Sequence, residues 1–269
     1  MSASTSRSVA VIFLQPQCNM SCTFCVTEDN FDALEFETAL RLLDQLVEQG
    51  FRSVIFGGGE PLTWRGDVFV LAAEAQHRGL HVQIGTNGIK LPDDFTHRDC
   101  VDRYVLPLES VDAAVHDAMR IHHRSHHATI LERMTALREA GKSLTVSTVL
   151  TATNCHGVLD LAAFLADYHG QAQNVHAWHL YQFLPLGRGG RPNTQQLAVP
   201  AEEYRRLCRQ VKAQNLPFRI FQRTDMYRPN TIEFFWGKSG QVVCGSESLH
   251  GEVGNERNQP TETDSVGTP

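Results

Sequence analysis

Three of the seven cysteines lie within eight residues, at Cys18, Cys22 and Cys25. Thiolates at these spacings can converge on one point from a loop, and they are the usual ligands of iron–sulfur clusters and structural zinc. A structural zinc site needs four protein ligands, so this CxxxCxxC triplet leaves one metal position open for a ligand that is not protein. The alternatives, a zinc knuckle or an ordinary ferredoxin-like cluster, need a fourth ligand nearby. The other cysteines are scattered, and we interpret them as structural thiols: Cys100, Cys155, Cys208 and Cys244.

A glycine–glutamate turn, Gly58-Gly59-Glu60, has the chemistry to hold such a ligand. An iron with an open position would bind an amine and a carboxylate together as a chelate, and an amino acid head group offers both. A neighbouring acid such as Glu60 would hold the ammonium group, and bare glycine backbone would allow close approach. A plain tight turn or a phosphate cradle is the alternative interpretation. A P-loop, however, requires Gly-Lys-Ser/Thr at the start of a helix, and no lysine follows here.

The segments around these motifs alternate between short apolar strands and amphipathic helices. The predicted strands are 9–14, 53–56, 81–84, 104–108, 144–150 and 177–184, and the predicted helices are 35–49, 67–78, 127–140, 157–168 and 201–213. Six strands that alternate with helices through short links predict a parallel sheet with helices outside it, because each crossover returns on the same hand. The expected fold class is therefore α/β, and a partial (β/α)6 barrel is favoured over an open doubly wound sheet.

The C-terminal part of the chain departs from this alternation. Residues 218–221 and a β-hairpin of 232–236 and 241–244 are expected to close the open side of the sheet. We therefore expect four parts: a flexible N-terminus (1–7), a core (8–190), a C-terminal helix and β-hairpin extension (191–244) and a polar, disordered tail (245–269).

Composition narrows the possible partners and compartments. The chain has 269 residues and a formal net charge of −6, and its Lys and Arg residues do not cluster, which argues against a nucleic-acid-binding surface. The apolar run 9–14 is too short for a signal sequence or a membrane span. An odd number of cysteines without a secretory signal fits a reducing compartment. We expect a cytoplasmic protein with no nucleic-acid or membrane partner.

Loops that follow parallel strands collect at one edge of the sheet, where α/β proteins bind their ligands. The cysteine loop would share this edge with residues 57–61, 85–88, 109–110 and 184–190. One pocket is therefore expected there. A group of histidines invites comparison with a second metal site, but it lies in a polar stretch between helices, and we interpret its members as solvated: His122, His123, His126 and His127.

These residues resemble the radical S-adenosylmethionine (SAM) enzymes over about residues 8–190. The three cysteines match the CxxxCxxC signature of that family, with an aromatic residue, Phe24, before the last one, and Gly58-Gly59-Glu60 matches its second motif. The resemblance implies a [4Fe-4S] cluster on Cys18, Cys22 and Cys25 whose fourth iron binds the methionine part of SAM. An electron from the cluster would cleave SAM to methionine and a 5′-deoxyadenosyl radical, which abstracts hydrogen from a substrate. A reductant such as flavodoxin or ferredoxin is the implied partner.

The resemblance also implies contacts to SAM by family position. Phe24 would lie against the adenine, Glu60 would hold the ammonium group and Arg120 would reach the carboxylate. The residues implied to line the nucleoside are Thr86, Asn87, Ser147 and Leu184. Leu108-Glu109-Ser110 departs from the more common Ser-X-Asp, so a ribose contact by Glu109 or Ser110 rests on position alone. Some relatives use a C-terminal cysteine to return a hydrogen atom to the substrate radical, and Cys244 is the candidate for that role.

Two finer functions compete, of which the first acts on an unidentified substrate. The first is a small-molecule or peptide-tailoring enzyme of the branch that includes the molybdenum-cofactor cyclase, indicated by residues 59–62, 86–88 and 185–188. No second cysteine cluster follows residue 190, so this branch member is predicted to lack an accessory cluster domain. The second is a nucleotide dehydratase resembling viperin, although the Asn-X-His pattern of that group is missing and the rim has few basic residues. A non-catalytic iron–sulfur electron carrier or sensor is the alternative from another class.

Overall fold

In the computed structural model, which describes residues 8–225 and 231–245, one nine-stranded sheet runs through the molecule in the order β11-β10-β1-β3-β4-β5-β7-β8-β9. Its strands are β1 (Val9–Phe13), β3 (Ser53–Gly57), β4 (His81–Gly85), β5 (Arg103–Pro107), β7 (Ser143–Leu150), β8 (Val175–Gln182), β9 (Arg219–Arg223), β10 (Ile232–Lys238) and β11 (Gln241–Cys244). Neighbouring strands are parallel except for the antiparallel β10–β11 hairpin. The predicted α/β class is therefore confirmed.

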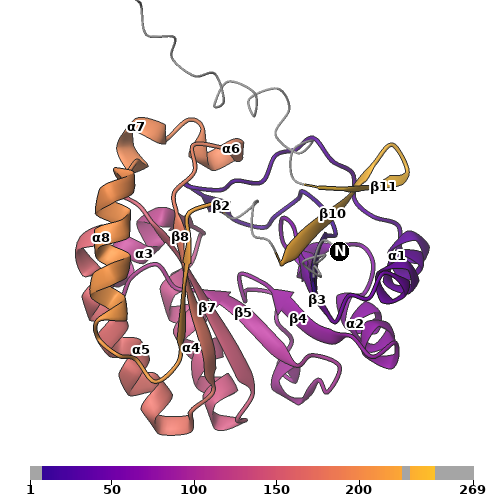
Figure 1. Ribbon diagram of the computed structural model, residues 1–269, viewed down its shortest axis with the longest axis horizontal. Helices are drawn as coiled ribbons and strands as arrows, with labels where there is room; N and C mark the ends of the chain where they lie inside the picture. The colour runs from indigo at the N-terminus through magenta and orange to yellow at the C-terminus, as the bar shows by residue number, and fades with distance from the viewer. Residues whose placement is uncertain (1–7, 226–230, 246–269) are drawn as a thin grey trace, which may run out of the picture.

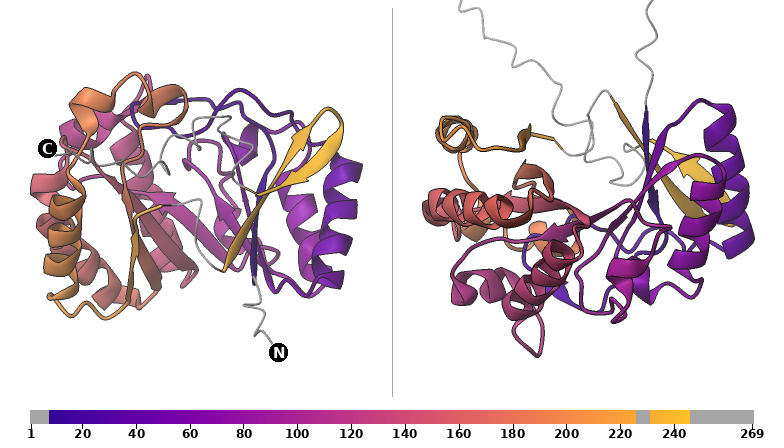
Figure 2. Two further views of the ribbon diagram at one scale, coloured as in Figure 1. Left: turned by 45° about the horizontal axis from the view of Figure 1, so that its top comes forward. Right: turned by 90° about the horizontal axis from the view of Figure 1, so that it is seen from below.

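Helices pack against the sheet along its length (Figure 1). The longer ones are α1 (Phe36–Glu48), α2 (Val68–His77), α4 (His126–Glu139), α5 (Val158–Ala172) and α8 (Ala201–Lys212). The shorter elements are α3 (Ala113–Met119), α6 (Gly187–Gly190), α7 (Thr194–Leu197), a two-stranded pair of β2 (Ser21–Cys22) and β6 (Arg120–Ile121), and 3₁₀ turns at Pro61–Thr63, Phe95–His97 and Cys155–Gly157. Figure 2 shows the sheet curving between the α1–α2 side and the α5–α8 side. None of the helices in the described ranges is long and apolar enough to cross a membrane.

The strands bury one face under the helices and turn the other face inward. In β1, β3 and β4 buried and half-buried residues alternate strictly, as expected when side chains point to opposite faces of a strand. The helix α1 buries the matching stripe, with Ala39, Leu42, Leu43 and Leu46 at helical spacing. The apolar core thus lies between the sheet and the helices, which leaves the inner face of the sheet available for a ligand.

The C-terminal strands extend both edges of the sheet. The predicted hairpin forms as β10–β11 and pairs in parallel with β1, whereas β9 pairs in parallel with β8 at the opposite edge. Helix α5 continues to Ala172, past the predicted end at residue 168. The predicted flexible N-terminus (1–7) and most of the predicted disordered tail (246–269) lie outside the described residues.

Candidate active site

The loops at the carboxyl ends of the strands enclose a cavity of about 300 Å³. Most of the residues singled out in the sequence line it: Cys18, Cys22, Phe24, Cys25, Gly58, Gly59, Glu60, Thr86, Asn87, Arg120, Ser147 and Leu184. The sequence interpretation missed several other lining residues, among them Met20, Thr27, Val105, Pro107, Val149 and Gln182. Successive side chains of a strand point to opposite faces of the sheet. This alternation alone could have placed Val105 and Pro107 of β5 and Val149 of β7 on the inner face.

The three cysteine thiols line this one cavity, and each has a side chain with N–H groups beside it. Asn87 Nδ2 lies 3.7 Å from Cys18 Sγ, and Arg120 Nη1 lies 3.6 Å from Cys22 Sγ. The Arg188 guanidinium lies beside Cys25 and interacts with it electrostatically. Such donors stabilise negative charge on sulfur. Because burial raises the pKa of the Cys22 thiol to about 12, a thiolate there needs both a donor and a metal.

The donor set fits an iron–sulfur cluster. No group of three His, Cys, Asp or Glu side chains within 8–225 and 231–245 could hold a single metal ion. The three cysteines nevertheless line one cavity, and three thiolates near one another are the ligands that an iron–sulfur cluster needs. Cys18, Cys22 and Cys25 would therefore hold the cluster, and Glu60 and Arg120 line the same cavity, where its non-protein ligand would bind.

The cysteine loop is held by close backbone packing against α6. The amides of Gly189 and Gly190 donate to the carbonyl of Cys25, at 3.0 and 3.2 Å. A Cβ atom on Gly189 would overlap the backbone of both Cys22 and Cys25. Only glycine fits there, so the glycine-rich segment after β8 sets the shape of the cysteine loop.

The glycine–glutamate turn packs against the start of the same loop. Gly59 N donates to Gln15 O at 2.7 Å, and Glu60 N donates to Gln17 O at 2.8 Å. Gly58 has a φ of 120°, and a Cβ on Gly59 would overlap the carbonyls before Cys18. Both positions therefore require glycine, and the turn fixes Glu60 relative to the cysteines.

The Glu60 carboxylate is 1% exposed and accepts three hydrogen bonds. The donors are Thr86 Oγ1 at 2.6 Å, Asn87 N at 2.7 Å and Leu62 N at 3.1 Å. Burial raises the pKa of Glu60 to about 7, and these hydrogen bonds oppose the shift. A buried carboxylate with a raised pKa is stabilised in its ionised form by a ligand that brings a positive charge.

Arg120 is held in place by a buried ion pair with Glu109. Its Nε and Nη2 lie 2.8 and 2.7 Å from Glu109 Oε1, and its guanidinium lies 5.0 Å from the centre of the Phe24 ring. Glu109 Oε2 accepts a further hydrogen bond from Val149 N at 2.7 Å. Glu109 thus lies behind Arg120. Ser110 Oγ accepts a hydrogen bond from Asp112 N. The structure does not bring Glu109 and Ser110 to the cavity wall, so the expected ribose contact has no support from their placement.

A chain of hydrogen bonds through two buried histidines links the two sides of the cavity. Glu109 N donates to His116 Nδ1 at 3.1 Å, so His116 Nε2 carries the proton and donates to His126 Nδ1 at 2.8 Å. His126 Nε2 in turn donates to Asn87 O at 2.8 Å. Burial lowers the pKa of His116 to about 2 and of His126 to about 4, so both rings are neutral. Each ring therefore has one tautomer that satisfies all of these bonds.

The prediction of solvated histidines is wrong for His126 and His127, which are 0% and 8% exposed. Helix α4 begins at His126, whose spacing to Ile130 and Met134 puts it on the buried face of that helix. This spacing is visible in the sequence and could have shown the burial. His123 is exposed, as expected.

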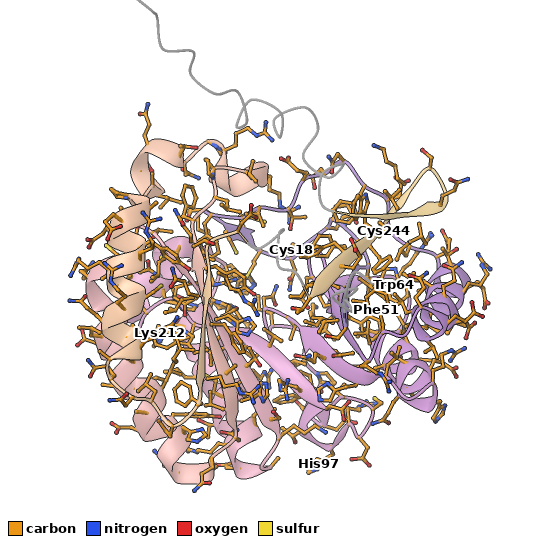
Figure 3. All side chains as sticks on the ribbon, viewed as in Figure 1. Cys18, Phe51, Trp64, His97, Lys212 and Cys244 are labelled. Atoms are coloured by element: carbon orange, nitrogen blue, oxygen red, sulfur yellow. The ribbon has the colours of Figure 1, made fainter. Side chains whose placement is uncertain are left out.

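Cys244 lies at the end of β11 and is exposed. Figure 3 shows it over the β10–β11 hairpin, with Cys18 nearer the middle of the molecule. Cys244 does not belong to the residues that line the cavity around Cys18. Its role as a hydrogen donor stays a prediction.

The profile of the Radical SAM superfamily matches residues 12–165. The chain belongs to the radical SAM superfamily. Radical SAM proteins are enzymes that use a [4Fe-4S] cluster and SAM, and they need a reductant and a substrate. The alternative of a non-catalytic electron carrier or sensor therefore has no support.

Curated relatives of this radical SAM chain differ in activity. It is 30% identical over 194 residues to the AdoMet-dependent heme synthase of Nitratidesulfovibrio vulgaris, covering 70% of this chain and 50% of that protein. It is 26% identical over 202 residues to an S-adenosylmethionine-dependent nucleotide dehydratase of Flammeovirga pacifica, covering 70% and 66%. It is 35% identical over 159 residues to a GTP 3′,8-cyclase of Mycobacterium sp. strain KMS, covering 55% and 43%. The chain thus spans about half the length of the heme synthase.

Solved radical SAM structures share the fold. Streptococcus suis SuiB bound to its precursor peptide SuiA superposes with a TM-score of 0.69 at 17% identity, over 81% of this chain and 49% of that one. Native anSMEcpe with bound AdoMet superposes with a TM-score of 0.59 at 13% identity, over 80% and 63%. At these identities the likeness is one of fold.

Proposed function

We propose that this radical SAM enzyme binds a [4Fe-4S] cluster through Cys18, Cys22 and Cys25 and cleaves SAM reductively, to abstract hydrogen from a small-molecule or peptide substrate. The observation that supports this is the convergence of three thiols, a buried carboxylate and a buried guanidinium on one cavity. The cluster would supply the electron that converts SAM to methionine and a 5′-deoxyadenosyl radical.

The chain's own residues divide the binding of SAM between them. Glu60 holds the ammonium group, because its buried carboxylate accepts its hydrogen bonds from neutral donors, the Thr86 hydroxyl and the backbone N–H groups of Asn87 and Leu62. Arg120 holds the carboxylate, and Glu109 keeps its guanidinium aimed at the cavity. Phe24 packs the adenine, while Ser147 on β7 and Leu184 in the loop after β8 line the nucleoside.

The test is formation of 5′-deoxyadenosine by anaerobically reconstituted protein with SAM and dithionite. Cys18→Ala, Cys22→Ala and Cys25→Ala should each abolish both cluster absorbance and 5′-deoxyadenosine. Cys100→Ala, a half-buried thiol outside the cavity, is the matched control and should keep both. A variant of the triplet that still forms 5′-deoxyadenosine would contradict the proposal.

A nucleotide dehydratase is the second candidate, and one comparison favours it. The nucleotide dehydratase of Flammeovirga pacifica is matched over 66% of its length, against 50% for the heme synthase and 43% for the GTP cyclase. Deuterium transfer from ribose-deuterated nucleoside triphosphates into 5′-deoxyadenosine tests this candidate. Deuterium transfer from a labelled peptide would instead favour a peptide substrate, the kind of molecule that SuiB binds in its complex with SuiA.

A further inference from the structure

The inner face of the sheet continues past the cavity onto the last two parallel strands. Val149 and Tyr181 line the cavity and are register partners on β7 and β8. Tyr181 is in turn the register partner of Arg223 on β9. Register partners on parallel strands point to the same face and lie about 4.8 Å apart. Arg223 therefore stands beside the cavity, at the same level as Tyr181.

The charged residues on this inner face all carry the same sign. Within the described strands, the charged residues on this face are Arg103, Arg219, Arg223 and Lys238. None of the strand residues on this face is acidic. The whole chain has the opposite bias, with 30 acidic residues against 24 Lys and Arg. Arg223 is the member of this set that stands beside the cavity, because Arg103 and Arg219 begin their strands at the far end and Lys238 is an exposed residue on β10.

Aromatic and hydrogen-bonding groups surround Arg223 at the cavity end of β9. The Arg223 guanidinium lies 4.9 Å from the centre of the Phe221 ring, and that ring packs edge-on against His179 at 5.0 Å. His179 Nδ1 lies 3.2 Å from the Tyr181 hydroxyl. Burial and the neighbouring Arg223 lower the pKa of His179 to about 3, so the ring is neutral. Whichever of the two donates in this bond, the pair keeps one further N–H or O–H to offer a ligand.

The spacing of these groups is fixed from behind. The hydroxyl of Tyr204 on α8 donates to Leu180 O at 2.7 Å and accepts from Arg223 N at 2.9 Å. Tyr204 is fully buried, so it ties β8 to β9 at the level of Arg223. The group is thus built on rigid elements, which favours a specific binding site.

We propose that Arg223, Tyr181, His179 and Phe221 form the substrate subsite of this enzyme and bind a planar organic anion. Arg223 and Tyr181 hold its phosphate or carboxylate oxygens, and Phe221 with His179 packs its planar ring. This inference rests on the proposed function, because the neighbouring cavity is where the hydrogen-abstracting radical would form.

The test measures binding of phenyl phosphate and of phenylacetate to the cluster-reconstituted protein with SAM, by isothermal titration calorimetry. At least one of the two should bind, and the tighter one identifies the oxyanion. Arg223→Gln should weaken that binding at least about tenfold, as expected for a lost charge-assisted hydrogen bond. Arg219→Gln is the matched control, because Arg219 lies on the same strand and face about 13 Å farther from the cavity. It should change the affinity less than about twofold, because screening is strong beyond about 10 Å.

Two further variants separate a lost contact from a folding defect. Arg223→Lys keeps the charge and should restore part of the affinity, and Tyr181→Phe keeps the ring and should weaken binding several-fold. Binding of neither probe, or equal binding by wild type and Arg223→Gln, would overturn the subsite. The same preparations are assayed for 5′-deoxyadenosine. If 5′-deoxyadenosine forms while the anions do not bind, only the proposed subsite is refuted. If the anions bind while 5′-deoxyadenosine does not form, only the proposed function is refuted.

Discussion

Acid should weaken SAM binding through Glu60. Burial raises the pKa of this carboxyl to about 7, and the carboxylate attracts an ammonium group only in its ionised form. The α-amino group of an amino acid has a pKa of about 8, so it stays protonated in the range below about pH 7. Between about pH 7 and about pH 5.5 the ionised fraction of Glu60 falls from about one half to about one thirtieth. The dissociation constant of SAM should therefore rise roughly fifteenfold.

Anaerobic calorimetry on cluster-reconstituted protein measures this constant. Glu60→Gln keeps the shape of the side chain but cannot ionise, so its dissociation constant should not vary with pH in this range. At about pH 7 it should exceed that of the wild type by roughly 10- to 100-fold, the effect of a lost charge-assisted hydrogen bond. Glu48→Gln removes an exposed carboxylate on α1 and should keep the wild-type slope. A wild-type constant that is the same at both pH values, in protein that stays folded, would refute the role given to Glu60.

Three further predictions concern the groups around the cavity. Gly59→Ala should lower both cluster content and SAM affinity, because its Cβ would overlap the carbonyl of Gln17 and displace the turn. Iron analysis and SAM titration measure these two quantities, and an unchanged cluster content and SAM affinity would contradict the close packing of Gly59. The His126 ring should by itself lower the free energy of unfolding by roughly 3 kcal/mol from about pH 6.5 to about pH 4, because its pKa is lowered to about 4 and it is neutral when folded but protonated when unfolded. Urea denaturation should show a smaller loss in His126→Gln, and equal losses would argue against the buried ring. Arg188→Gln removes a positive charge beside Cys25 and should lower the cluster's reduction potential by on the order of 100 mV. An unchanged midpoint potential in an EPR-monitored redox titration would argue against an interaction between Arg188 and Cys25.

The two motifs could be found in the sequence because each is local. The spacing of Cys18, Cys22 and Cys25 places three thiols on one loop whatever the rest of the chain does. The turn at Gly58 to Glu60 follows a strand, and the carboxyl ends of parallel strands meet at one edge. Strand and helix positions were also predictable within a few residues, because apolar periodicity reports the buried face of each element.

The contacts that orient the motifs could not be found in this way. Arg120 and Cys22 are 98 residues apart, and their 3.6 Å contact depends on pairing between β2 and β6. The partner strands of β9 and β10 were likewise unpredictable, because short strands of similar composition fit more than one edge of a sheet. His126 and His127 are buried against expectation, because their helical spacing to buried residues outweighs the polarity of the segment.

The sequence by itself determined which groups do the chemistry: three closely spaced thiols, and a glutamate on a glycine turn, because ligand type and spacing are properties of a short segment. Only the tertiary structure decided what surrounds each of them. It placed Glu109 behind Arg120, tied Asn87 to His116 through His126, and laid Gly189 against the cysteine loop. These contacts join residues from different strands and helices, and they form only when the register of the sheet brings those elements to one edge.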